Sequence, residues 1–509
     1  MVLRAGPKDD VRRAQFLELC NGFLSRHHLI LASNRGPVEH HIGPDGRIEP
    51  RKGSGGVVTA LSSLTRHVEF TWIASAMGEG DRHIAGANPG LHIKSPLPGQ
   101  RVNLRYVAMP RRIYHKFYNI FCNPLLWFLQ HYMWNSPYNP NLDLTVHDAW
   151  LEGYIPVNEA FAQAIVEEAQ SLSKPSLVLL HDYHLYLAPG LVRQELPNAL
   201  IQHFIHIPWP TPRYWQLLPA EMRRALCASL CAADVVGFQT REDMHNFLYC
   251  CEEFLPGAVA DYSRETVTLE DRRVAARVYP ISIDVEEVRR IGSSPRALEY
   301  EKKLLPLCNE KTMVRVDRAE PSKNIVRGFK AFGALLSRSP EFHGRVNFLA
   351  FLVPSRTHIR QYERYLNEID QVIQGINSTF GTPDWQPITV FYENNYTQAI
   401  AGMRLYDVLL VNSVIDGMNL VAKEGPVVNT KDGVLILSET TGAFKQLCDG
   451  ALAVAPADIE GTMHAMYQAL VMDNEERSRR ATFLTQAIEQ EDITHWLTCQ
   501  IEDLQALVS

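Results

Sequence analysis

The sequence predicts an α/β protein built from two domains, each with its own parallel β-sheet. Three observations lead to this fold class. The chain has 509 residues, which is too long for one hydrophobic core. Short apolar runs recur between longer helical stretches, as expected of buried parallel strands. Polar residues follow many of these runs, and open α/β sheets bind their ligands where the strands end.

The predicted strands form two series. The first is Leu29–Ser33, Ser176–Leu180, Ile201–Ile205, Asp234–Phe238 and Arg277–Ile281. The second is Thr312–Val316, Val346–Val353, Ile388–Tyr392, Asp407–Val411, Val434–Leu437 and Ala451–Val454. The boundary between the series lies near residues 283–300, so we expect domains over 1–285 and 286–480. We expect 481–509 to be a helix that packs back on the first domain, with packing positions Trp496, Leu497, Ile501, Leu504 and Leu507.

Polar residues stand directly after these strands. They are Asn34-Arg35, His181-Asp182, His206, Gln239-Thr240, Arg318, Ser355-Arg356, Asp416 and Ser438-Glu439. Two domains that face each other across a hinge would bring both sets together. The sequence therefore predicts a binding site in a cleft between the domains.

Composition excludes several classes of function. The formal charge of −7 is mild and unpatterned, which argues against a nucleic acid or an anionic membrane as a partner. No apolar run approaches the roughly 20 residues that a spanning helix needs. The nine cysteines are odd in number and include no C-x-x-C pair, so neither a disulfide framework nor a zinc site is expected. We therefore expect a cytoplasmic protein.

The loop Gly53-Ser54-Gly55-Gly56 precedes a predicted helix over Val57–Leu64. Its amides and the positive end of that helix could hold an anion. A glycine cluster is more often simply a turn into a helix, and the third glycine of G-x-G-x-x-G is absent. The phosphate interpretation therefore needs support from elsewhere in the chain.

Arg318 and Lys323 supply that support, because they follow a predicted strand and flank a proline that forces a turn. Two cations at a strand end can neutralise a diphosphate leaving group, although most Arg and Lys residues are solvated surface charges. No D-x-D triplet, the usual device for holding a metal ion on a nucleotide sugar, occurs in the chain. Side chains and amides would then have to meet the charge of the leaving group.

The segment from Asp416 to Glu424 carries two carboxylates at a second strand end. If the chain is helical from residue 418 onward, Glu424 lies two turns into the helix on the side of the site. Glu424 would suit a ribose diol and Asp416 the hydroxyls of a sugar. An N-cap role is the competing interpretation for Asp416.

Two histidine clusters, His181-Asp-Tyr-His184 and His206-Ile-Pro-Trp-Pro210, each end a predicted strand. A single histidine there would more often be a core residue whose hydrogen bonds are satisfied. Polar clusters on adjacent strand ends indicate a site.

In these motifs the chain resembles trehalose-6-phosphate synthases, which are retaining glycosyltransferases of the GT-B type. The resemblance runs from Leu29 to Trp496. The motifs that carry it are Ser33-Asn34-Arg35, Gly55-Gly56, His181-Asp-Tyr-His-Leu185, His206-Ile-Pro-Trp-Pro-Thr-Pro212, Gly237-Phe-Gln-Thr240 and Asp416-Gly-Met-Asn-Leu-Val-Ala-Lys-Glu424. It implies a GT-B fold of two Rossmann-like domains that face each other across a central cleft, the first binding the acceptor and the second the nucleotide sugar.

The resemblance implies glucose transfer from UDP-glucose or GDP-glucose to glucose 6-phosphate, which makes α,α-trehalose 6-phosphate. The acceptor hydroxyl would attack the face that the phosphate leaves, and the leaving phosphate would accept the proton. No enzyme nucleophile, cofactor or metal ion is then expected. Association into dimers or tetramers is a further expectation from the family.

Roles carried over by the resemblance cover both substrates. Donor contacts would come from Gly55, Gly56, His206, Arg318, Lys323, Asp416, Gly417, Met418, Asn419, Leu420 and Glu424. Acceptor contacts would come from Arg35, Trp72, Tyr118, Trp127, Asp182 and Arg356, with the two arginines on the phosphate. Asp182, His206, Arg318 and Lys323 would be the catalytic residues.

The chain departs from the family pattern at three positions near the expected donor. Ile415 replaces the usual arginine, Glu320 stands where an aspartate is common, and Asn324 replaces a glycine. The nucleotide preference among uridine, guanosine and adenosine diphosphate glucose therefore stays open.

Three other functions compete with this interpretation. A related transferase could use glycerol 3-phosphate or a cyclitol phosphate, and the three predicted aromatic contacts argue against the smaller of these acceptors. A catalytically silent regulatory homologue would have lost Arg318, Lys323 or Glu424, and all three are present. A dehydrogenase is disfavoured because G-x-G-x-x-G is absent and a second strand series is present.

Overall fold

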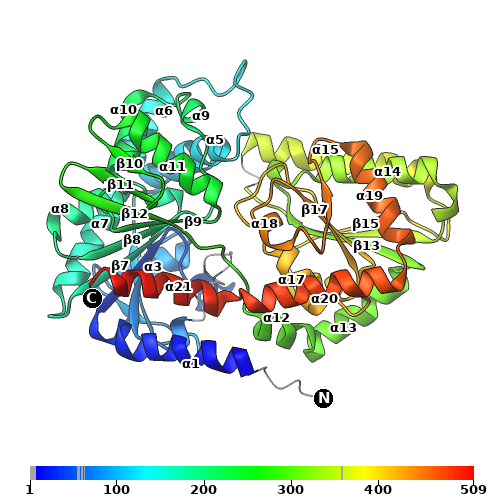
Figure 1. Cartoon of the computed structure of the whole chain (residues 1–509), viewed down its shortest axis with the longest axis horizontal. Coiled ribbons are helices and arrows are strands. Elements are labelled where there is room, and N and C mark those ends of the chain that lie inside the picture. The colour runs from blue at the N-terminus through cyan, green and yellow to red at the C-terminus, as the bar shows by residue number, and fades with distance from the viewer. Residues whose placement is uncertain (1–6, 54–57, 59–60, 62–63, 357–358, 509) are drawn as a thin grey trace. The chain divides into compact units, whose positions relative to one another are not determined.

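The computed structural model describes residues 7–53, 58, 61, 64–356 and 359–508 of the chain, and Figure 1 shows its helices and strands. Contacts between residues divide the chain into two compact units. Unit 1 comprises Met1–Ile281 with Thr494–Ser509, and unit 2 comprises Ser282–Ile493. Each unit is described by itself below.

Unit 1 is built on a ten-stranded sheet in the order β10-β11-β12-β9-β8-β7-β1-β4-β6-β5. The strands are β1 (His28–Ser33), β4 (Phe70–Ser75), β5 (Ile93–Lys94), β6 (Val102–Val107), β7 (Ser176–His181), β8 (Leu200–Phe204), β9 (Val235–Phe238), β10 (Val259–Asp261), β11 (Thr266–Leu269) and β12 (Arg272–Val278). The strands from β12 to β6 are parallel, and β10, β11 and β5 pair antiparallel at the edges. Every residue of β1, β4 and β8 is buried, as expected of strands covered on both faces.

The order in which the chain adds parallel strands to the sheet of unit 1 reverses at one place. The chain builds outward from β1 through β4 to β6, and then starts again at β7 on the other side of β1. In open α/β sheets, ligands bind at such a switch point, outside the carboxyl ends of the strands. The switch point of unit 1 therefore lies where β1 and β7 end.

Helices connect these strands. They are α1 (Pro7–Gly22), η1 (Leu24–Arg26), η2 (Leu64–Arg66), α3 (Glu79–Ala87), α4 (Arg111–His115), α5 (Phe128–Gln130), α6 (Leu144–Ala149), α7 (Ile155–Gln170), η5 (Tyr183–Leu185), α8 (Ala188–Glu195), α9 (Pro212–Trp215), α10 (Ala220–Leu230) and α11 (Arg241–Phe254). Two further stretches, η3 (Lys116–Trp127) and η4 (Trp150–Tyr154), are π-helical. Strands β2 (Val38–Ile42) and β3 (Ile48–Lys52) form a separate hairpin.

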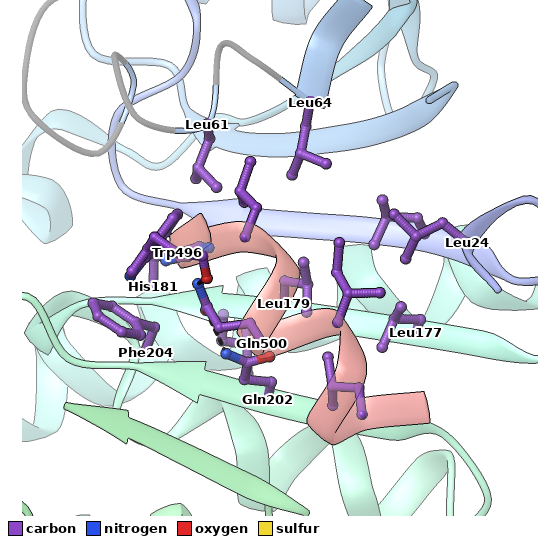
Figure 2. Close-up of a pocket in the computed structure, with 15 residues that line it drawn as sticks. Leu24, Leu61, Leu64, Leu177, Leu179, His181, Gln202, Phe204, Trp496 and Gln500 are labelled. Atoms are coloured by element: carbon purple, nitrogen blue, oxygen red, sulfur yellow. Dashed lines mark hydrogen bonds between the residues drawn. The ribbon is translucent and has the colours of Figure 1, made fainter. Parts of the chain in front are cut away.

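Helix α21 (Ile493–Ala506) packs on the sheet of unit 1, although it ends the chain. Trp496 Nε1 donates a hydrogen bond of 3.1 Å to Tyr279 O, and Gln202 Nε2 donates one of 2.6 Å to Gln500 Oε1. Figure 2 shows Trp496 beside His181, and Gln500 beside Gln202, around a small cavity. Of the predicted packing positions, Trp496, Leu497, Ile501 and Leu504 are buried. The prediction for Leu507 is wrong, because this residue lies past the end of the helix and is exposed.

Unit 2 has a six-stranded parallel sheet in the order β15-β14-β13-β16-β17-β18. The strands are β13 (Lys311–Arg318), β14 (Val346–Val353), β15 (Ile388–Tyr392), β16 (Val408–Val411), β17 (Val434–Ser438) and β18 (Leu452–Val454). This is the Rossmann order, in which the chain reverses between the first and fourth strands. The switch point of unit 2 therefore lies where β13 and β16 end.

The helices of unit 2 pack around that sheet. They are α12 (Val285–Gly292), α13 (Pro295–Leu304), η6 (Leu305–Leu307), η7 (Pro321–Lys323), α14 (Ile325–Arg338), η8 (Pro340–Phe342), α15 (Arg360–Phe380), α16 (Tyr396–Arg404), α17 (Val421–Val428), α18 (Phe444–Leu447), α19 (Ile459–Val471) and α20 (Asn474–Gln490). The core between α14 and the sheet includes Phe329 and Phe332, whose rings each meet Phe348 of β14 edge-on at 5.3 Å.

The two boundaries differ from the expected ones at 285/286 and 480/481. The first lies at 281/282 and the second at 493/494. The second moves because α20 stays with unit 2. Gln446 Nε2 bonds to Ala487 O at 3.0 Å, and Arg480 Nη1 bonds to Ala451 O at 2.9 Å.

Candidate active site

Two loops meet at the switch point of unit 2. The loop after β13 runs through η7, and the loop after β16 is tied to it by a hydrogen bond of 2.7 Å from Val414 N to Ser322 O. Asn324 then takes a left-handed φ of 56° and turns the chain into α14. Local geometry therefore presents the side chains of both loops at the carboxyl edge of the sheet.

Lys323 and Asp416 form an ion pair between these loops. The Asp416 carboxylate also accepts hydrogen bonds of 3.1 Å from Asn419 Nδ2 and of 3.3 Å from Ser413 Oγ. Only 11% of the Lys323 side chain is exposed, so water screens this cation weakly. Predictions drawn from separate motifs assign Lys323 to a diphosphate and Asp416 to a sugar, and the structure brings the two side chains into contact.

Glu320 joins two arginines in the same unit. Its Oε1 lies 3.1 Å from Arg318 Nη1 and 3.6 Å from Arg356 Nη1, and it accepts a hydrogen bond of 3.0 Å from Ser355 Oγ. Burial by itself would raise the pKa of this carboxyl, but Arg318, Arg356 and Lys323 outweigh it and lower the pKa to about 2. A charged Glu320 therefore holds the arginine predicted for the donor next to the one predicted for the acceptor.

The segment from Asp416 to Glu424 folds differently from the prediction. Helix α17 begins at Val421 rather than at residue 418, because Asn419 has a left-handed φ of 75°. Glu424 consequently lies in the first turn of α17 and not two turns in. Its carboxyl is buried and accepts a hydrogen bond of 2.8 Å from Tyr396 OH. Burial raises the pKa of Glu424, and the bond from Tyr396 lowers it by less.

Two residues that sequence reasoning missed shape this segment. Tyr396 comes from the first turn of α16 and reaches Glu424. Gly442 packs so closely that a Cβ there would lie 1.8 Å from Gly417 O. Its neighbour Ala443 also donates an N–H bond of 3.0 Å to Met418 O. Neither contact can be predicted from the sequence around these residues, because both contacts depend on the order of the strands in the sheet.

At the switch point of unit 1, Asn34 and Arg35 follow β1. Asn34 Oδ1 accepts hydrogen bonds of 2.8 Å from Ser75 Oγ and of 3.2 Å from Tyr114 OH. The Arg35 side chain is half-exposed and hydrogen-bonds to Tyr118. The arginine predicted for the acceptor phosphate is thus accessible at a switch point.

Asp182 follows β7 and has an unusual backbone, with φ of 73° and ψ of 171°. Residues other than glycine rarely occupy this region, and doing so costs about 1–3 kcal/mol. Surrounding bonds hold the conformation. Asp182 N donates to Phe204 O at 2.8 Å, and Asp182 O accepts from His203 Nε2 at 3.1 Å. Strain that its surroundings enforce is typical of functional positions.

Three histidines cluster beneath Asp182. His181 Nδ1 lies 3.1 Å from His206 Nε2, and His203 binds the Asp182 carbonyl. Burial lowers the pKa of His181 to about 3 and that of His206 well below its ordinary value. Burial, together with His181, lowers the pKa of His203 to about 3, against a smaller opposing effect of the bond to Asp182. All three are neutral near pH 7, so His206 can present a ring nitrogen or its carbonyl to a sugar without carrying charge.

A pH dependence of stability follows from this cluster. The unfolded state protonates His203 near pH 6.5, whereas the folded state does so only near pH 3. The contribution of His203 to the stability of the folded state is therefore fully present above pH 6.5 and is lost as the pH falls toward 3. Between pH 6 and 5, the free energy of unfolding should fall less steeply for His203→Gln than for the unmodified chain, by about 1.4 kcal/mol per pH unit. Denaturant titrations at each pH measure this difference. The two slopes should coincide above pH 7.5, and equal slopes below pH 6 would contradict the prediction.

The three predicted acceptor aromatics are all buried, but Tyr118 and Trp127 keep 8% and 3% of their surface exposed, whereas Trp72 keeps none. Tyr118 stacks against Tyr114 at 5.6 Å and against His184 at 5.9 Å, all beside the unit 1 switch point. Trp127 stacks on His131 at 4.1 Å. Both predicted rings come from the π-helical stretch η3, and such stretches are frequent at functional sites.

Trp72 does not fit the predicted role of an acceptor contact. Its side chain has no exposed surface in β4, and its Nε1 donates a hydrogen bond of 2.8 Å to Ser33 Oγ. A ring with no exposed surface has no face to offer to a sugar. The structure therefore places Trp72 in the core of unit 1.

Gly55 and Gly56 lie outside the described residues, as does most of the predicted helix over 57–64. Gly53, which precedes them, is closely packed, since a Cβ there would lie 2.2 Å from Gly36 O.

In residues 7–53, 58, 61, 64–356 and 359–508, no group of three or more His, Cys, Asp or Glu side chains could hold a metal ion. Over the same described ranges, no helix has both the length and the apolar character needed to cross a membrane.

Two Rossmann-like units, with cations at the switch point of unit 2, are the architecture of the GT-B class of glycosyltransferases. The chain belongs to glycosyltransferase family 20, whose family model matches residues 27–506. This confirms the predicted fold class and family.

Known relatives agree with this assignment. A bifunctional trehalose-6-phosphate synthase/phosphatase from Thermoproteus tenax is 34% identical over 486 residues, which are 92% of this chain and 62% of the relative. The chain thus spans less than two thirds of that relative. A UDP-forming α,α-trehalose-phosphate synthase 2 from Aspergillus niger is 32% identical, over 92% of this chain and 95% of the relative. A solved UDP-forming synthase from Burkholderia xenovorans, in complex with glucose 6-phosphate, has a TM-score of 0.80 and 28% identity, over 94% of this chain and all of that one.

Proposed function

We propose that this chain is an α,α-trehalose-phosphate synthase. It transfers glucose from a nucleoside diphosphate glucose to glucose 6-phosphate and makes α,α-trehalose 6-phosphate with retention of configuration. The observation that carries the proposal is the set of charged side chains at the switch point of unit 2, where Lys323 pairs with Asp416 and Arg318 pairs with Glu320. The relatives named above act in trehalose phosphate synthesis, which supports the choice of reaction.

The donor would be held by its diphosphate and its ribose. Arg318 is half-exposed and Lys323 largely buried, so the first can reach a phosphate from solvent and the second acts where screening is weak. The Glu424 carboxylate suits the two hydroxyls of a ribose. Tyr396 keeps that carboxylate oriented through its hydrogen bond. Asp416 and His206 would bind hydroxyls of the transferred glucose.

The acceptor would be held by its phosphate and by flat rings. Arg35 and Arg356 are the proposed phosphate contacts, with Tyr118 and Trp127 shaping the sugar site. Arg356 Nη1 donates a hydrogen bond of 2.6 Å to Tyr362 OH, which fixes the direction of its guanidinium. Asp182 would lie beside the reacting hydroxyl. The alternative acceptors glycerol 3-phosphate and a cyclitol phosphate remain outcomes of the test below.

Chemistry at the anomeric carbon needs no enzyme nucleophile in this proposal. The bond from that carbon to the leaving phosphate breaks while the bond to the acceptor oxygen forms on the same face. The acceptor proton passes to the leaving phosphate oxygen. Arg318 and Lys323 stabilise the charge that grows on the leaving diphosphate, a task that other transferases give to a metal ion. We propose that neither a metal ion nor a cofactor is needed.

A product assay tests the proposal. Purified protein is incubated with glucose 6-phosphate and UDP-, GDP- or ADP-glucose in the presence of a chelator. Formation of trehalose 6-phosphate is expected, and the donor that supports it settles the nucleotide preference. Turnover only with a cyclitol phosphate or glycerol 3-phosphate would replace the acceptor in this proposal. Absence of turnover with every pair would indicate a silent homologue, and turnover only without chelator would refute metal independence.

Two further aspects belong to the same proposal. No disulfide joins any two of the nine cysteines, all of which lie in the described residues, and this supports a reducing compartment such as the cytoplasm. Dimers or tetramers remain an expectation from the family, which the sedimentation velocity of the purified chain would test.

A further inference from the structure

Arg315 in β13 is a fully buried arginine in unit 2. Its Nε and Nη2 donate hydrogen bonds of 2.9 and 2.7 Å to Asp317 Oδ2. Its Nη2 also donates a bond of 3.0 Å to Lys323 O, and its Nη1 donates one of 3.3 Å to Ile325 O. One guanidinium therefore holds main-chain carbonyls on both sides of Asn324.

These carbonyls belong to the turn that presents Lys323. Asn324 has a left-handed φ of 56°, so the turn between η7 and α14 is not a conformation that the local chain prefers. Asn324 Nδ2 bonds to Asn412 O at 2.8 Å, which ties the turn to the end of β16. The Arg315 fork and this amide fix the main chain from which the Lys323 side chain reaches Asp416.

The charge of Arg315 is balanced locally by Asp317, so it adds little net potential at the switch point. The planar shape of its guanidinium is what matters at this site, because only a guanidinium can donate hydrogen bonds to one carboxylate and two carbonyls at fixed angles. An ammonium group on a flexible stem donates from a single point. Geometry, rather than charge, would therefore be lost on replacement by lysine.

We propose that Arg315 is a positioning residue for Lys323, and that it sets the affinity of the switch point for a diphosphate group. This inference rests on the proposed function, in which Lys323 contacts the diphosphate of the donor. A positioning role for Arg315 differs from a merely structural role in the ligands that its replacement affects. Loss of the fork weakens the binding of a nucleoside diphosphate and leaves the binding of the monophosphate nearly unchanged.

A matched control exists in the same unit. Arg477 is also buried and ion-paired, with its Nη2 3.4 Å from Asp407 Oδ1 and 3.2 Å from Lys431 O. Asp407 precedes β16, so this pair lies at the opposite edge of the sheet from the switch point. Arg477→Lys thus makes the same chemical change in a similar environment, away from the proposed site.

A second variant moves the Arg315 guanidinium without removing it. A Cβ at Gly328 of α14 would lie 2.5 Å from Arg315 Nη1, so Gly328→Ala must displace that fork. Alanine is also the better helix former, which offsets part of any loss of stability. This variant keeps the inference testable if Arg315→Lys does not fold.

The test is calorimetric titration of the unmodified chain with UDP, GDP and ADP, and of each folded variant with UDP and with UMP. If UDP does not bind, the diphosphate that binds and its monophosphate replace this pair. For Arg315→Lys we expect the affinity for UDP to fall about tenfold and that for UMP to change less than about twofold. Gly328→Ala should shift the UDP affinity in the same direction, and Arg477→Lys should shift neither ligand. In a Lys323→Ala background, Arg315→Lys should no longer change the affinity for UDP.

Each outcome bears on one claim. Equal UDP affinity of the unmodified chain and of Arg315→Lys would overturn the inference alone, as would an equal loss for UDP and UMP. A full tenfold effect that persists without Lys323 would overturn the coupling between the two residues. An unmodified chain that binds none of UDP, GDP and ADP would overturn the proposed function, and the inference with it.

Discussion

Replacement of Lys323 by alanine is expected to lower kcat by about 10²–10³-fold. The ammonium group lies at the switch point of unit 2, is largely buried, and pairs with Asp416. As the glycosidic bond breaks, charge grows on the leaving diphosphate, and a cation with little access to water stabilises that charge strongly. The measurement is the rate of UDP release at saturating donor and acceptor, since a transition-state effect appears in kcat.

Lys330→Ala is the control for this prediction. Lys330 is an exposed residue of α14, the helix that starts just after Lys323. Its replacement should leave kcat within about twofold, as for most surface substitutions. Near-normal turnover of a correctly folded Lys323→Ala protein would refute the role of this cation.

Replacement of Asp182 by glycine is expected to remove activity while it relieves backbone strain. Turnover should fall by about 10²-fold or more, because this change removes the carboxylate that we propose lies beside the reacting hydroxyl. Glycine adopts the observed φ of 73° and ψ of 171° without a steric penalty, whereas other residues do not. The Asp182→Gly protein should therefore be more stable than Asp182→Ala, by about 1 kcal/mol.

The comparison between these two variants isolates the backbone. Both lack the carboxylate, so both should be equally inactive, and they differ only in the freedom of one residue. At an ordinary position, glycine is the less stable of the two by about 0.5–1 kcal/mol, so the order of the two melting temperatures decides the question. A higher melting temperature for Asp182→Ala would show that position 182 is not strained.

Much of the fold could be predicted from the sequence. Strands β14 and β15 have the predicted bounds, because each coincides with a run rich in apolar and β-favouring residues. Strands β4 and β6 were not predicted, since polar residues such as Arg105 interrupt the apolar pattern of β6. Strand β12 begins at Arg272 rather than at Arg277, because antiparallel pairing with β11 extends it toward its amino end. Pairing partners in space are not visible in a local pattern.

The sequence by itself determined where charged and polar side chains stand relative to strand ends. Arg318, Asp182 and Asp416 follow apolar runs, and parallel strands of one sheet end at a common edge, so their placement follows from chain order. The family also follows from local motifs, and the match over residues 27–506 confirms it.

Only the tertiary structure decided which of these side chains are buried and which meet. Trp72 is fully buried, Glu424 falls in the first turn of α17, and Glu320 joins Arg318 to Arg356. Burial and ion pairing depend on neighbours that are distant in the chain, such as β13 beside β16, and strand order sets those neighbours. The physical reason is that desolvation and Coulomb energy act through space, whereas a sequence pattern records only neighbours along the chain.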